Sequence, residues 1–193
     1  IVLDHGTAIV VTFGNFRQPF GLEENFTSRN LVFMERSFGT DPFVVGRRMG
    51  IEVARWDPNW RLAASMFGAD VADFEKDDDE TINFAARFNY TPIRNDESVL
   101  LLGASAALRK TDFDSGEVRF DVRPESYVGD VKFTDTDDIE DVDKYNVMGG
   151  ELAYVNKRFY AQGEYMMASV TRLDDLEDVG FGGGYVYAAY FLT

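Results

Sequence analysis

Charged residues of both signs lie close together in the stretch FGNFRQPFGLEENFTSRNLVFMERS, residues 13–37. They are Arg17, Glu23, Glu24, Arg29, Glu35 and Arg36. A guanidinium group has a planar fork that binds phosphate or a carboxylate through two charge-assisted hydrogen bonds, and it does not lose its proton. The stretch could therefore bind an anion through its arginines, or the arginines could pair with the nearby glutamates and hold a loop in place.

Residues for enzymatic chemistry are sparse by comparison. The chain has one histidine, His5, and no cysteine, so disulfides and thiolate metal ligands are excluded. The sequence contains no GxSxG motif, no HExxH motif and no phosphate-binding glycine loop. We therefore predict a protein that is not an enzyme, with no catalytic residue and no cofactor.

Acidic residues outnumber basic ones, 34 to 19, and the formal net charge is -15. Affinity for nucleic acids depends on basic patches against phosphates, so no nucleic-acid partner is expected. Three acidic runs, at residues 73–80, 135–143 and 173–178, are interpreted as solvated loop surfaces. Weak binding of Ca²⁺ or Mg²⁺, which would bridge these loops to anionic lipid head groups, is the alternative, because clustered carboxylates suit both ions.

Apolar and polar residues alternate with a period of two in several segments, which is typical of β-strands. In ETINFAARFNY, Phe84 and Phe88 fall on one face, and Arg87 and Asn89 fall on the other. NWRLAASMFG and EVRFDVR alternate in the same way, and no segment has the pattern of a capped helix. The alternation predicts an all-β fold of antiparallel strands.

The connections between the expected strands alternate in length. Tight turns are expected at residues 56–60, 90–97 and 156–157, and long polar connections at 69–80, 111–117 and 171–180. Short turns on one side and long loops on the other are the layout of a transmembrane β-barrel. Between residues 111 and 156 the alternation requires a further short strand at 129–134, and the downstream register depends on that strand.

A membrane barrel and a soluble β-domain differ in what the apolar face of each strand contacts. A soluble sandwich or ligand-binding barrel turns its apolar face to a dry core, whereas a membrane barrel turns it to lipid. Aromatic residues at strand ends favour the membrane, because interfacial girdles require them: Trp56, Trp60, Tyr90, Tyr145, Tyr154 and Tyr160. Charged residues on the opposite face also favour it, because a dry core would need them paired: Arg48, Glu52, Arg87, Glu151 and Glu164.

The ordered blocks GNFRQPFGLEE, FMERS and GRRMG resemble the phosphate-selective porin O and P family. The later blocks NWRLAASMFGADV, RFDVRPE, AQGEYMMASV and YVYAAYFLT fit the same family, so the resemblance covers residues 13–193. It implies an outer-membrane porin of Gram-negative bacteria, with a barrel of roughly 16 antiparallel strands assembled as a homotrimer. The partners that it implies are the lipid bilayer, lipopolysaccharide, and phosphate, polyphosphate or other small anions.

About ten strands are expected in this chain, too few for a wide aqueous channel. We therefore expect residues 1–193 to form a single β-barrel domain that is incomplete at both ends. Residues 18–44 are expected to form one long constriction loop that folds into the interior, since long functional loops of this kind occur in pores.

The resemblance and the strand faces together indicate candidate site residues. The expected anion-binding residues at the constriction are Arg17, Arg29, Arg36 and Arg48. The expected pore-lining residues are Glu52, Arg61, Arg87, Arg109 and Glu151, with Arg119 and Arg123 on the same wall. A line of arginines could guide anions. The alternative is that each arginine pairs with a carboxylate such as Glu52 or Glu151, which would neutralise it.

The predicted function is the passive diffusion of small anions, phosphate or polyphosphate among them, across an outer membrane. A porin of the same fold with general or different selectivity stays open as an alternative, because lysine is scarce and the net charge is acidic. A soluble all-β ligand-binding domain, in which the PFGLE segment caps a pocket, is the alternative from another class of protein.

Overall fold

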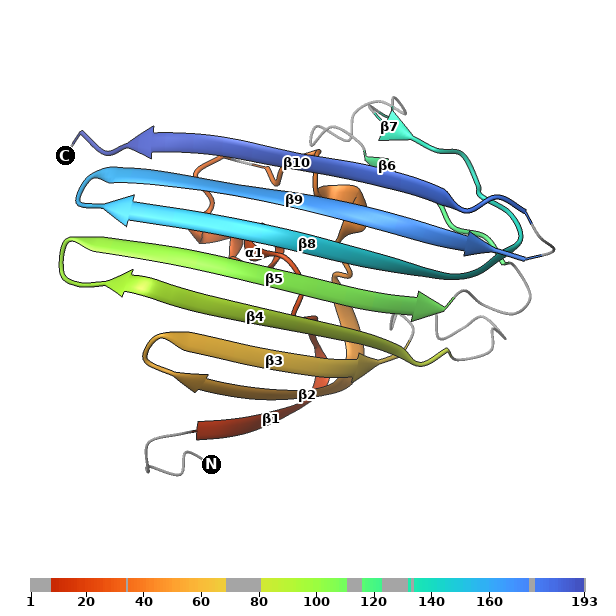
Figure 1. The fold of residues 1–193 in the computed structure, drawn as a ribbon, viewed down its shortest axis with the longest axis horizontal. Coiled ribbons are helices and arrows are strands. Elements are labelled where there is room, and N and C mark those ends of the chain that lie inside the picture. The colour runs from red at the N-terminus through yellow and green to blue at the C-terminus, as the bar shows by residue number, and fades with distance from the viewer. Residues whose placement is uncertain are drawn as a thin grey trace.

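The computed structural model describes residues 8–33, 35–68, 81–110, 116–122, 132, 134–173 and 176–192. Antiparallel strands dominate it (Figure 1). Among the described residues, no helix has both the length and the apolar character that crossing a membrane requires.

Eight strands form one curved antiparallel sheet. They are β1 (Ala8–Arg17), β2 (Arg47–Asp57), β3 (Trp60–Phe67), β4 (Asn83–Arg94), β5 (Ser98–Lys110), β8 (Val142–Asn156), β9 (Phe159–Arg172) and β10 (Val179–Tyr190). Each strand pairs with the next one in this order, and β1 and β10 are the two edges of an open sheet. The prediction of an all-β fold built from antiparallel strands is confirmed.

The segment EVRFDVR, residues 117–123, is not a strand of this sheet, and that prediction is wrong. Its described part forms β6 (Asp121–Val122), which pairs with β7 (Thr134–Asp135) in a separate two-stranded ribbon, and Val118 forms an isolated bridge with Ile139. The expected strand at 129–134 lies largely outside the described residues. Strand β8 pairs directly with β5. No strand of the described chain therefore lies between β5 and β8 in the wall, and the two run antiparallel.

The connections alternate in length as predicted. Strands β2 and β3, β4 and β5, and β8 and β9 are joined by tight turns on one side of the sheet (Figure 1). The other connections are longer and lie on the opposite side. The connection at residues 18–46 contains α1 (Leu22–Asn25) and the 3-10 helices η1 (Ser28–Asn30) and η2 (Asp41–Phe43).

Apolar side chains are exposed on the convex face of the sheet, and polar side chains are buried on the concave face. On β4, Phe84 and Phe88 are 50% and 46% exposed, whereas Arg87 and Asn89 are buried. The same order holds along β3, where Leu62 is exposed. This is the reverse of a soluble β-domain and is the arrangement expected of a barrel wall in lipid.

The predicted aromatic girdle is correct only in part. Trp60 and Tyr90, which lie opposite each other on β3 and β4, are on the convex face near the tight turns. Trp56 lies instead on the concave face, opposite Arg61. Tyr145 does not belong to the girdle, because its side chain is buried in a cluster on the concave face. Tyr160 also points inward, where its ring packs 5.9 Å from the ring of Tyr187.

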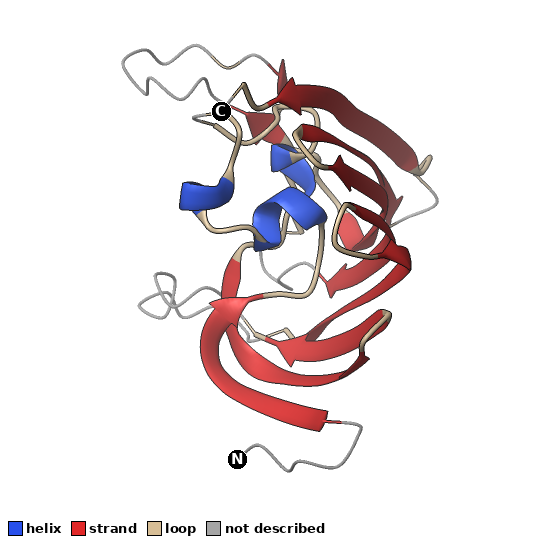
Figure 2. Cartoon of the chain, turned by 90° about the vertical axis from the view of Figure 1, so that its left-hand side faces the viewer, coloured by secondary structure: helices blue, strands red, loops and turns tan. Residues whose placement is uncertain are grey.

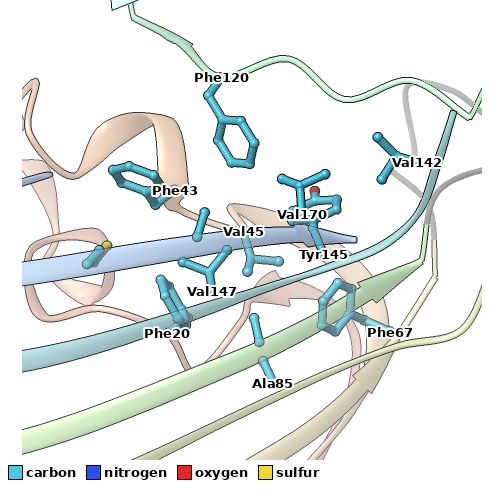
Figure 3. Close-up of a cluster of buried hydrophobic side chains, with 13 residues drawn as sticks. Phe20, Phe43, Val45, Phe67, Ala85, Phe120, Val142, Tyr145, Val147 and Val170 are labelled. Carbon is cyan, nitrogen blue, oxygen red and sulfur yellow. The ribbon is translucent and has the colours of Figure 1, made fainter. Parts of the chain in front are cut away.

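The concave face divides into two halves along the strands. The apolar half, near the long connections, is a packed cluster that includes Phe67, Val147 and Val170 (Figure 3). Phe20 and Phe43 from residues 18–46 and Phe120 from the β6 segment complete that cluster. The polar half, near the tight turns, carries Glu52, Arg61, Arg87, Asn89, Glu151, Gln162 and Glu164. The interior is therefore filled at one end and polar at the other.

Candidate functional site

The segment of residues 18–46, here called the inner loop, folds onto the concave face of the sheet (Figure 2). Its first residues are almost completely buried, with Phe20 at 0% exposure and Leu22 at 2%. Gly21 has a φ of 72°, in the region that favours glycine, and its N–H donates to Ser105 Oγ on β5 at 3.4 Å. The inner loop therefore turns sharply from the end of β1 into the interior, where the constriction loop was predicted.

Glu164 on β9 anchors the start of the inner loop. Its carboxylate accepts the backbone N–H of Leu22 at Oε1 and the backbone N–H of Glu23 at Oε2, the latter over 3.0 Å. The hydroxyl of Tyr185 on β10 donates to the same Oε2 over 2.7 Å. Sequence reasoning placed Glu164 on the inner face but missed this role. The available signal was a carboxylate in the inward register of a strand rich in apolar residues.

Arg17 and Arg36 are bonded to the inner loop itself. Arg17 Nη1 donates to the carbonyl oxygens of Glu24 and Phe26, at 2.5 and 2.7 Å. Arg36 Nε lies 3.0 Å from Glu24 Oε2, and Arg17 Nε lies 3.6 Å from Glu24 Oε1. The two predicted anion-binding arginines thus share one buried carboxylate, which is the bracing arrangement that the sequence left open.

Burial acts on the carboxylates of the inner loop. It raises the pKa of Glu24, although Arg36 and Arg17 act in the opposite direction. Burial also raises the pKa of Glu23, whose Oε2 accepts the backbone N–H of Ser37 at 2.8 Å. The arginines therefore offset only part of the cost of burying these charges. Their guanidinium groups are bonded to Glu24 and to backbone carbonyl oxygens of the inner loop.

The other two predicted anion-binding arginines lie apart from this network. Arg29 is exposed in η1. Arg48 lies at the start of β2, where its Nη1 donates to the carbonyl oxygen of Arg47 over 2.7 Å. The four residues Arg17, Arg29, Arg36 and Arg48 are therefore not brought together in one site.

The predicted pore-lining residues form two ion pairs on the polar half. Arg87 on β4 binds Glu151 on β8 through Nε and Nη2, with the shortest distance 2.6 Å, and Asn89 donates to the same carboxylate. Arg61 Nη2 lies 3.5 Å from Glu52 Oε1. The neutralising carboxylates that the sequence suggested, Glu52 and Glu151, are thus the ones found.

Arg109, the remaining pore-lining candidate, lies over an aromatic ring. Its guanidinium carbon is 5.1 Å from the ring centroid of Tyr145, a cation–π distance. Arg109 is on β5 near the long connections, at the same end of the sheet as Arg48 on β2. Both arginines therefore lie on the concave side of the wall near its long-loop end.

Arg119 is not on the barrel wall, and that prediction is wrong. It lies in the segment before β6, where its Nε donates to Asp135 Oδ1 over 2.7 Å. Lys132 Nζ lies 3.2 Å from Asp135 Oδ2, and Arg119 and Lys132 together hold the pKa of Asp135 well below its usual range. The physical reason is that the ribbon of β6 and β7 is separate from the sheet, and its charged side chains pair with one another. Arg123 lies outside the described residues.

The acidic runs give no metal site in the described part of the chain. Residues 73–80 and part of 173–178 lie outside it. In the run at 135–143, Asp135, Asp137 and Asp138 all lie near Arg119. Within the described residues, no group of three or more potential ligands could hold a metal ion.

Close backbone contact of Gly39 with Gly183 and Gly184 holds the inner loop against β10. A Cβ atom built on Gly183 would lie 2.1 Å from the carbonyl oxygen of Gly39. One built on Gly39 would lie 2.3 Å from the carbonyl oxygen of Gly184. Neither position can hold a larger residue unless the backbones separate.

Gly183→Ala is therefore expected to displace the inner loop around Gly39, at a cost of about 1–3 kcal/mol in the free energy of loop docking. Hydrogen exchange at the amides of residues 39–43 measures the displacement, and faster exchange is expected. Gly180→Ala is the matched control on the same strand, because its Cβ would meet only the carbonyl oxygen of Ala168, at an ordinary 3.7 Å. Equal exchange in the two variants would contradict the assigned contact.

Three comparisons with known proteins bear on this arrangement. A family model described as phosphate-selective porin O and P matches residues 4–193. A Caulobacter vibrioides protein named as uncharacterized is 30% identical over 196 residues, which cover 95% of this chain and 38% of that relative. The chain thus spans less than two fifths of the length of that relative. No solved structure was found to match the chain.

Proposed function

The chain belongs to the phosphate-selective porin O and P family, and from that membership we propose that it forms part of the wall of an outer-membrane porin. We further propose that small anions, phosphate or polyphosphate among them, diffuse passively through the complete pore. The observation that carries the proposal is the order of the faces, with apolar side chains outside, polar side chains inside, and the inner loop on the concave face. A porin family also implies a channel rather than an enzyme.

The polar half of the concave face is the proposed solute path. Arg61 pairs there with Glu52 and Arg87 pairs with Glu151, so a permeating ion meets hydrogen-bonding groups whose charges largely cancel. The inner loop narrows the interior next to this half, and narrow polar stretches set selectivity in pores. Arg48 and Arg109, near the long-loop end, are the proposed attractors of anions.

A second candidate is a porin of the same fold with another selectivity. It is favoured by the pairing of Arg17 and Arg36 with Glu24, and of Arg61 and Arg87 with Glu52 and Glu151. A paired arginine produces a much weaker field at a distance than an isolated one, and salt screens what remains. The two candidates differ only in the sign and strength of ion preference.

Reversal potentials of the full-length protein in planar bilayers separate the two candidates. Under a potassium chloride gradient, anion permeability is expected to exceed cation permeability, and phosphate is expected to reduce the chloride current. Arg48→Ala combined with Arg109→Ala is expected to lower the anion preference several-fold, because both removed charges lie near the long-loop mouth. Arg55→Ala is the control, since Arg55 packs on the ring of Trp60. A preference for potassium over chloride would contradict the anion proposal and favour the second candidate.

The surroundings of the protein are proposed on the same basis. We place it in the bacterial outer membrane as a homotrimer, with the convex face in the lipid bilayer and the long loops near lipopolysaccharide. Weak Ca²⁺ or Mg²⁺ binding at the acidic loops would suit such contacts. Dependence of the folded state on detergent or lipid tests this placement against a soluble ligand-binding domain, which stays folded in plain buffer.

A further inference from the structure

We propose that a pocket between the inner loop and β10 is a binding site for a neutral polyhydroxylated ring, that is, a sugar unit. The proposal rests on the function proposed above, because the sugar would be a solute that pauses there during permeation. The pocket has a volume of about 770 Å³, within the range of small-molecule sites. Its lining includes Phe33, Phe38, Tyr185, Tyr187, Glu23 and Arg36.

Aromatic rings form a platform along one side of the pocket. Tyr185 and Tyr187 are two residues apart on β10, so both point to the concave face. Their rings are stacked, with centroids 5.7 Å apart and an angle of 14° between the planes. Phe33 of the inner loop places its ring edge-on to Tyr187, with centroids 5.2 Å apart. Rings from two separate segments therefore converge on the same space.

Hydrogen bonds fix the orientation of this platform. The Tyr185 hydroxyl donates to Glu164 Oε2 over 2.7 Å, and it accepts a hydrogen bond from Gln162 Nε2. The hydroxyl of Tyr160, whose ring packs against Tyr187, donates to Gln162 Oε1. The rings are thus held in place before a ligand arrives, which lowers the entropy cost of binding.

The chemistry of the lining favours a neutral ligand with many hydroxyl groups. The face of a sugar ring carries C–H groups that pack on an aromatic face, and its hydroxyls need donors and acceptors around the perimeter. Glu23 supplies carboxylate oxygens and Ser37 supplies a hydroxyl. Arg36 in the same lining is bonded to Glu24, so it offers phosphate little. An anion would also face Glu23 and Glu35.

The rings remain inside the barrel whether or not β10 is paired on its free side. Tyr185 and Tyr187 alternate with Val186, which is 84% exposed and also belongs to the pocket lining. A further strand bonded to β10 would extend the wall in the plane of the sheet. The inward rings would still face the interior.

Block of the ionic current by maltotriose tests the proposal in the full-length protein. Maltotriose is expected to reduce the chloride conductance in planar bilayers in a saturable manner. Tyr187→Ala is expected to raise the half-blocking concentration about three- to tenfold, because it removes the central ring of the platform. Tyr187→Phe keeps the ring and is expected to preserve the block. Tyr165→Ala is the matched control, since Tyr165 is 57% exposed on the convex face.

Calorimetric titration of the detergent-solubilised protein with maltotriose separates failure of this proposal from failure of the porin proposal. Sugar binding that is weakened by Tyr187→Ala supports the site even if no current is observed. A conducting channel that maltotriose neither blocks nor binds overturns the sugar site while the porin proposal stands. Tighter binding of tetraethylammonium, also lost in Tyr187→Ala, assigns the pocket to organic cations and overturns the sugar proposal as well.

Discussion

Glu151→Gln is expected to destabilise the folded protein by about 3–5 kcal/mol, because it leaves the guanidinium of Arg87 buried without its counter-charge. Both side chains are nearly inaccessible, at 7% exposure for Arg87 and 2% for Glu151. Arg87 binds the carboxylate through two nitrogens, and Asn89 donates to Oε1 as well. A glutamine side chain keeps one acceptor oxygen but lacks the negative charge that offsets the buried guanidinium of Arg87.

The reach of Glu151 across a neighbouring strand makes the pair specific. Glu151 lies on β8 and Arg87 on β4, with β5 between them. The side chain crosses β5 at Gly103, where a Cβ atom would lie 2.3 Å from Glu151 Oε1 and 2.5 Å from Asn89 Nδ2. Gly103→Ala should therefore break the same pair by steric exclusion. A destabilisation close to that of Glu151→Gln is expected.

Urea unfolding of the full-length protein in lipid vesicles measures these effects. Glu52→Gln is the matched control, because its partner Arg61 is 38% exposed and sits 3.5 Å away, so about 0–1 kcal/mol is expected. Arg87→Gln combined with Glu151→Gln should recover much of the loss, since it removes the unbalanced charge. Equal losses for Glu151→Gln and Glu52→Gln would show that burial does not determine the cost.

The faces of the wall strands could be predicted from the sequence, because each side chain there meets either lipid or the interior. Phe84 and Phe88 lie on the exposed face of β4 and Arg87 lies on the buried face, as the alternation predicts. EVRFDVR shows the same alternation but does not form a strand of the wall. Its inward residue Phe120 packs on the rings of Phe43, Tyr145 and Phe181 in the interior cluster. Local periodicity reports that one face is buried, and it does not report against what.

The contacts of the site could be predicted only in part. The sequence could predict that Arg87 pairs with some inward carboxylate, since a buried arginine needs one. The partners of the inner loop were not foreseeable, because Leu22 and Glu164 are 142 residues apart in sequence. Gly103 and Gly183 carry no local signal either. Each is required by an atom from another strand or loop that crosses it.

Glu164→Ala is expected to release the start of the inner loop and to raise the single-channel conductance of the complete protein. The variant removes both acceptors of the backbone N–H groups of Leu22 and Glu23, which are buried in the interior. Each buried donor left without a partner costs about 1–3 kcal/mol. A loop that has lost this anchor occupies the interior for a smaller fraction of time, so the path beside it widens.

Hydrogen exchange at the amides of Leu22 and Glu23 gives the direct readout, and a rate increase of at least about 30-fold is expected from the loss of about 2 kcal/mol. Tyr185→Phe is the matched control, because it removes one hydrogen bond to Glu164 and leaves both backbone donors satisfied. Its exchange rates at these two amides should stay close to those of the unaltered protein. Faster exchange without a higher conductance would mean that the inner loop is anchored by Glu164 but does not limit the flow of ions. Unchanged exchange in Glu164→Ala would show instead that the packing of Phe20 and Leu22 alone holds the loop in the interior.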